Sequence, residues 1–146
     1  MRRALKDIKK KERGLALVET SIAMLTVLIA LFGVIEVGRL LWTYNALADA
    51  TRLGARWAVV NGQDTTAVQN MVLYGTTTAG TEPIVSGLTA SNVNVTYSSF
   101  GIASGRATVT IQNFNFNFSV PLFGTSLALP PFTTTLTGEA ANAPRP

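Results

Sequence analysis

The stretch that decides the fold is RGLALVETSIAMLTVLIALFGVIEVGR, from Arg13 to Arg39. Between Leu15 and Ile35 it contains a single charged residue, Glu19. A helix over 15–35 covers roughly 31 Å at 1.5 Å per residue, which is about the thickness of the hydrocarbon core of a bilayer. The sequence therefore predicts a transmembrane helix with a carboxylate about one turn inside its N-terminal end.

The charges that flank this helix predict its orientation. Residues 1–14 hold seven of the twelve Lys and Arg residues and two of the eight acids, which leaves the remainder of the chain with a net charge of −1. By the positive-inside rule, the N-terminus stays in the cytoplasm and the C-terminal part is extracytoplasmic. We expect a single-pass protein of the inner (cytoplasmic) membrane, in contact with lipid. The chain lacks the basic face that nucleic-acid binding requires.

The composition argues against several kinds of chemistry. The chain contains no cysteine and no histidine, which excludes disulfides, thiolate nucleophiles, Cys/His metal sites and histidine-based triads. The acids after Gln63 are Asp64, Glu82 and Glu139, too far apart in sequence to suggest a catalytic pair. We predict no catalytic residue, no cofactor and no metal site, and hence a protein that is not an enzyme.

The junction between the basic leader and the apolar helix contains a glycine, Gly14, with Glu19 five positions after it. This order resembles the class III signal of type IV pilins, which a prepilin peptidase cuts after the glycine. The resemblance implies that residues 1–14 are removed and that the mature chain begins at Leu15. The new amine of Leu15 on one subunit could then pair with Glu19 of a neighbour, because neither charge is stable alone in an apolar medium.

Two plainer interpretations of this segment remain. Glu19 is tolerated in an uncleaved signal anchor, since a carboxylate near a helix end costs less than one at the centre. Alternatively the segment is a secretory signal peptide, although such peptides have an apolar core of about 7 to 15 residues.

The helix is expected to continue through residues 36–62. This region contains no proline, its apolar residues recur at three-and-four spacing, and Asn61-Gly62 supplies a stop. Small residues at intervals of four form a strip on it: Ala46, Ala50, Gly54 and Ala58. Such a strip allows close approach of another backbone, from either the protein's own sheet or a neighbouring helix.

Residues 63–146 are expected to form a small exported domain with antiparallel strands. Asp64 is placed to cap a short helix that Gly75 ends, and a polar linker follows. Alternating apolar and polar residues predict strands at 93–98, 107–111, 114–119 and 132–138, with a five-residue hairpin connection at 101–105 and a loop at 121–131. The parity of the alternation changes near Gln112-Asn113, so we expect a bulge or a break there.

The predicted fold class is therefore α+β, with a long N-terminal transmembrane helix that continues into the exported part and packs on one antiparallel sheet of three or four strands, as in pilins. This packing would bury Phe114, Phe116 and Phe118 in the core. The alternative is an aromatic face on which a sugar stacks.

Three segments resemble the TadE-like family of pilus assembly proteins, the pseudopilins of the Tad (Flp) type IV pilus system. The matching residues are Arg13, Gly14, Val18 and Glu19 in the opening; Ile35, Glu36, Gly38 and Arg39 beside the membrane; and Ala50, Arg52, Gly54, Ala55, Arg56, Trp57 and Ala58 in the helix extension. The resemblance implies a structural or assembly subunit of the Tad pilus. Its implied partners are a prepilin peptidase, other pilin-like subunits and the inner-membrane assembly platform.

Two alternatives to a minor pilin-like subunit are kept. In the first alternative, the chain is the major subunit of its own filament. In the second, it is an uncleaved, membrane-anchored extracytoplasmic binding domain.

Overall fold

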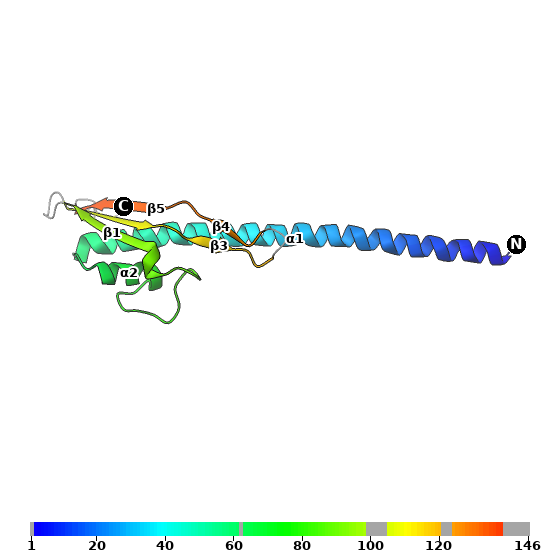
Figure 1. Ribbon diagram of the computed structural model, residues 1–146, viewed down its shortest axis with the longest axis horizontal. Coiled ribbons are helices and arrows are strands. Elements are labelled where there is room, and N and C mark those ends of the chain that lie inside the picture. Colours follow the sequence, from blue (N-terminus) through cyan, green and yellow to red (C-terminus); the bar gives the residue numbers. More distant parts are fainter. Residues whose placement is uncertain (1, 62, 99–104, 121–123, 139–146) are drawn as a thin grey trace, which may run out of the picture. The chain divides into compact units, whose positions relative to one another are not determined.

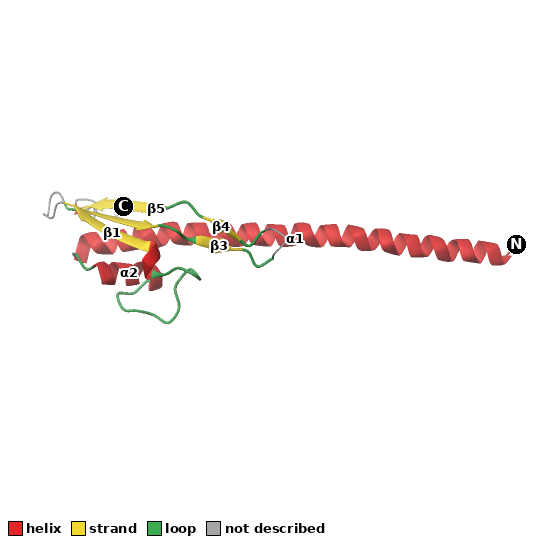
Figure 2. Ribbon diagram, in the orientation of Figure 1, coloured by secondary structure: helices red, strands yellow, loops and turns green. Residues whose placement is uncertain are grey.

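The computed structural model describes residues 2–61, 63–98, 105–120 and 124–138, with side chains from Gly14 onward (Figure 1). The described chain divides into two compact units, Met1–Gly38 and Arg39–Pro146. The elements are α1 (Arg2–Asn61), α2 (Thr65–Tyr74), the 3-10 turn η1 (Ala90–Asn92), β1 (Val93–Ser98), β2 (Arg106–Ile111), β3 (Asn115–Asn117), β4 (Ser126–Ala128) and β5 (Phe132–Thr137). The predicted α+β fold class is confirmed (Figure 2).

The first unit consists of the N-terminal part of α1. Among the described residues, α1 contains the one stretch that is long and apolar enough to cross a membrane, with a mean hydropathy of 2.3 and none of that stretch buried. Its large apolar side chains are exposed, with Leu15 at 72% and Val34 at 71%. An apolar helix surface of this extent requires cover from lipid or from other helices.

The second unit is built on the C-terminal part of α1, which ends at Asn61, where the sequence predicts its stop. The apolar core of this unit includes Leu47, Ala50, Ala55 and Ala58 of α1, all at most 4% exposed. Gly54 lies among Val68 and Val72 of α2 and Val109 of β2, so that a Cβ built there would overlap the Cγ2 of Val72. Ala50, Gly54 and Ala58 of the small-residue strip are thus buried in the protein's own core, and Ala46 is partly buried.

The short helix α2 forms as the sequence predicts. The Asp64 carboxylate accepts a hydrogen bond from the Ala67 amide at 3.0 Å, and Gly75 ends the helix with φ of 72°. The linker that follows is also part of the core, since Val85 and Leu88 are buried. The sequence analysis missed this contribution because isolated apolar residues in a loop have no periodicity.

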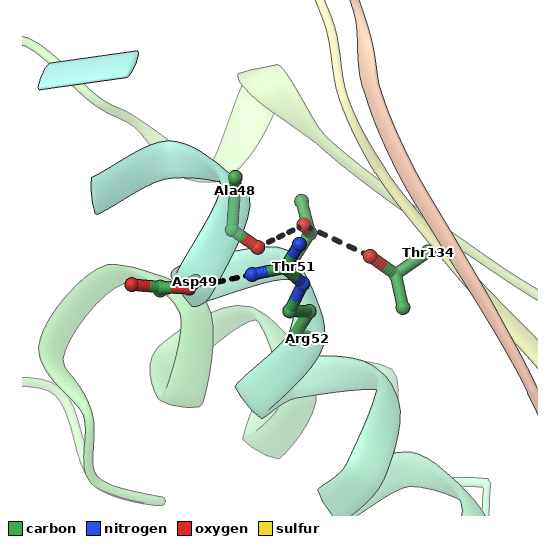
Figure 3. A network of polar contacts seen from close by, with 5 residues as sticks. All are labelled: Ala48, Asp49, Thr51, Arg52 and Thr134. Carbon is green, nitrogen blue, oxygen red and sulfur yellow. Dashed lines mark hydrogen bonds and ion pairs between the residues drawn. The ribbon is translucent and has the colours of Figure 1, made fainter. Parts of the chain in front are cut away.

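The main sheet has the antiparallel order β1-β2-β5, with Val95 opposite Val109 and Ile111 opposite Phe132. Its inward face packs on α1, and a hydrogen bond of 3.1 Å from the Thr134 hydroxyl to the Thr51 hydroxyl joins β5 to the helix (Figure 3). Most of the five-residue hairpin connection expected at 101–105 lies outside the described residues.

The break predicted at Gln112-Asn113 is confirmed. Asn113 adopts a positive φ of 55°, and the Asn92 side-chain amide donates hydrogen bonds to the carbonyls of Gln112 and Asn113 at 3.1 and 3.0 Å. Asparagine tolerates this left-handed conformation better than most residues do. In a regular strand Ile111 and Phe114 would point to opposite faces, and the break allows both to be buried.

The expectation of one sheet is wrong. After the break, β3 leaves the main sheet and pairs instead with β4, which lies in the segment predicted to be a loop. The turn at Asn113 redirects the chain away from the main sheet. All three residues of β4 are exposed, so its sequence has no alternation of apolar and polar residues from which a strand could be predicted. Phe114 and Phe116 are buried and Phe118 is partly buried, which supports the core interpretation of these aromatic residues.

We predict that Gly54→Ala destabilises the second unit by about 1 to 3 kcal/mol, because the added methyl group overpacks the contact with Val72. Gly38→Ala is the matched control, since a Cβ there would meet nothing within 4 Å and alanine favours the helix by up to about 1 kcal/mol. Urea unfolding of the full chain in detergent, followed by near-UV circular dichroism, measures both changes. Equal urea midpoints for Gly54→Ala and Gly38→Ala would contradict the close approach of Val72 to Gly54.

Alkaline pH is expected to destabilise the second unit through Tyr97. Burial, and secondarily the charge of Asp64, raise the pKa of Tyr97 above its usual value. A raised pKa means that the folded state holds the phenolic proton more tightly, so this contribution is complete below about pH 10, the unfolded pKa, and is lost as pH rises through the folded value. Tyr97→Phe should flatten the fall in unfolding midpoint between pH 9 and pH 11. If the unfolding midpoint of Tyr97→Phe fell with pH as steeply as that of the wild type, Tyr97 would not be the cause of the loss of stability at alkaline pH.

Candidate assembly site

The N-terminal end of the apolar helix contains the residues predicted to take part in processing and pairing. Gly14 is exposed, and a Cβ built on it would meet nothing within 4 Å. Leu15 is 72% exposed, and Glu19, one helical turn further on, is also exposed. Among the residues whose side chains the structure describes, none lies beside the Cβ position of Gly14, and the bond between Gly14 and Leu15 lies within α1.

The other polar side chains near Glu19 satisfy their hydrogen bonds within the helix. The hydroxyls of Thr20, Ser21 and Thr26 each donate to the carbonyl oxygen four residues earlier, at 2.8, 2.8 and 3.0 Å. This back-bonding makes a hydroxyl inexpensive in an apolar medium. A carboxylate is only an acceptor when ionised and has no comparable partner within the helix. A carboxylate in an apolar medium is therefore stabilised by a donor or an opposite charge, whereas the hydroxyls of Thr20, Ser21 and Thr26 are already bonded in the helix.

The juxtamembrane residues of the predicted motif differ in their surroundings. Glu36 is 3% exposed, whereas Gly38 and Arg39 are exposed. The Arg39 guanidinium lies over the ring of Phe116 in β3, 5.3 Å from its centroid, in a cation–π contact. Phe116 in turn meets Phe118 edge to face. Arg39 thus connects the start of the second unit to the β3-β4 hairpin, a role the sequence analysis did not assign to it.

The motif residues in the helix extension fall into two groups. Ala50, Gly54 and Ala55 are buried and allow the close packing of α1 against α2 and the sheet. Arg52 and Arg56 are exposed; Arg52 forms an ion pair of 2.9 Å with Asp49 on the surface of the helix, as Figure 3 shows. The structure explains the small residues by packing and leaves both arginine side chains on the surface.

The predicted site residues therefore lie in separate places rather than in one cluster. Gly14, Leu15, Val18 and Glu19 are exposed on the first unit, and the buried Ala50, Gly54 and Ala55 pack within the second. Arg13 lies in the part of α1 whose side chains are not described.

Comparison with known proteins gives a family match. Residues 14–56 match the model of the family described as TadE-like protein, which confirms the predicted resemblance. The match begins at Gly14 and ends within α1, so α2 and all the strands lie outside it. No curated protein and no solved structure matched the chain. The family match indicates a role in Tad pilus assembly.

Proposed function

We propose that this chain is a pilin-like structural subunit of a Tad pilus, cut by a prepilin peptidase between Gly14 and Leu15. The observation that carries the proposal is the extent of the TadE-like match, which begins at the residue where the leader would end and includes Glu19. The accessible Gly14 and the unburied apolar helix support it. Cleavage would remove seven positive charges and leave one new amine at the start of the apolar helix.

The amine of Leu15 and the carboxylate of Glu19 would then bind neighbouring subunits to each other. In lipid or in a helical bundle an isolated charge is costly, whereas a hydrogen-bonded pair of opposite charges largely offsets that cost. The exposed apolar side chains of the same helix would pack between subunits and exclude water. Pairing would set the axial position of each incoming chain, because only one position brings the two charges together.

We expect Gly14→Leu to block processing and to leave membrane insertion unchanged. Space around Gly14 is open, so the new side chain does not strain the protein itself, and any loss reflects contact with the peptidase. Gly38→Leu is the matched control, because Gly38 is equally open. Intact mass and N-terminal sequencing of membrane-extracted protein measure the cut. Normal cleavage of Gly14→Leu, or a wild-type chain that still begins at Met1 in cells with an active prepilin peptidase, would refute the proposal.

For Glu19→Ala we expect normal insertion and cleavage but at least about a hundredfold less incorporation into an assembly, since breaking a buried ion pair costs roughly 3 to 5 kcal/mol. Thr20→Ala is the control, because the Thr20 hydroxyl is already bonded to Ala16 in its own helix. Quantitative recovery of tagged subunits from cross-linked assemblies gives the ratio. Equal incorporation of both variants would leave Glu19 as a tolerated charge in a passive anchor.

A further inference from the structure

Within the second unit, α1 carries a groove of about 610 Å3. Six residues of α1 and Ile84 of the linker line it; those of α1 are Trp42, Asn45, Ala46, Asp49, Ala50 and Leu53. Four of them, Trp42, Asn45, Ala46 and Asp49, have the spacing i, i+3, i+4, i+7, which is the set that forms a hole for one side chain of a facing helix.

A second groove, of about 220 Å3, has the same construction further along the helix. It is lined by Leu53, Arg56, Trp57 and Val60, again at i, i+3, i+4 and i+7. The two sets are eleven residues apart, which is about three turns and about 16.5 Å. A helix that fills both holes needs two large apolar side chains with this same separation.

The chain itself provides such a pair. Trp42 and Leu53 are eleven residues apart on the same helix and are 61% and 42% exposed, although both are large and apolar. Copies anchored in one membrane have parallel α1 helices. If a second copy is shifted by four residues, its Trp42 lies level with the first hole and its Leu53 lies level with the second. The required shift is about 6 Å.

Charge favours the same shift. Asp49 of the shifted copy lies level with Leu53 of the first and hence between Arg52 and Arg56. With no shift, Asp49 would face Asp49 and Arg56 would face Arg56, which is repulsive. A shift of seven residues in the opposite direction would place Leu53 of the second copy level with the first hole. The residue of the second copy level with the second hole would then lie beyond Asn61, where α1 ends.

We propose that the outer face of α1 between Trp42 and Val60 binds the same face of a second copy of this chain, with parallel helices offset by about four residues. The inference rests on the proposed function for its parallel orientation. Because the holes of one copy receive the side chains of the next, the contact is heterologous and can be repeated from copy to copy. Arg52 and Arg56 would then act as partners for Asp49 of the neighbouring chain.

Cysteine cross-linking tests the offset directly, because the chain has no cysteine of its own. One copy carries Asn45→Cys, a second copy with a size tag carries Asp49→Cys, and both are expressed together as full chains in membranes. At the proposed offset these positions lie level, so the mixed pair should oxidise to a dimer at least about fivefold more than either variant alone. Thr133→Cys with Thr135→Cys, two exposed positions on the sheet, gives the background from collision.

Truncation then tests the side chain that fills the first hole. Trp42→Ala in the Asn45→Cys copy should lower the dimer yield about tenfold, whereas Leu41→Ala, at a similarly exposed position, should change it less than twofold. Stronger cross-linking of Asp49→Cys with itself, a yield no higher than background, or equal effects of the two truncations would overturn the proposal. The size of each monomer reports leader cleavage separately: cleaved chains without the dimer refute only this interface, and uncleaved chains with the dimer refute only the processing.

Discussion

The close approach of α1 to α2 and to the central strand at Gly54 is the constraint on which the second unit depends. Glycine and alanine on this side of α1 bring Val68, Val72 and Val109 within van der Waals distance of the helix backbone. A larger residue at this point would separate the helix from both layers and expose the valines. The hydrogen bond between Thr134 and Thr51 holds β5 to the same helix.

Much of the fold could be predicted from the sequence, because helix length, hydrophobic pattern and caps are local signals. The end of α1, the Asp64 cap and the turn at Asn113 all depend on residues close in sequence. The separate β3-β4 sheet could not be predicted in this way, since β4 has no buried side and its pairing with β3 is a tertiary contact. The burial of Val85 and Leu88 was missed for the same reason. In the candidate site, the sequence identified the family segment and Glu19, but the contact of Arg39 with Phe116 required the structure.

The two halves of α1 serve different purposes, and their compositions reflect this. The segment 15–35 is apolar except for one charge, Glu19, near the basic leader, and this composition suits contact with lipid. The C-terminal half has a small-residue side that packs against α2 and the main sheet, and it also has exposed apolar residues and the exposed ion pair of Asp49 and Arg52. A subunit built in this way would present contact surfaces along one helix, at the membrane and beyond it.

The central claim is that Glu19 pairs with the amine of Leu15 on another subunit. Solid-state NMR of assemblies mixed from two separately labelled preparations tests it most directly, with the N-terminal amine labelled with nitrogen-15 in one and the glutamate carboxyl carbons labelled with carbon-13 in the other. The account predicts a nitrogen–carbon contact corresponding to an ion pair within about 4 Å, present in the mixed sample and absent after Glu19→Ala. A mature amine with no carboxylate contact between subunits would contradict it.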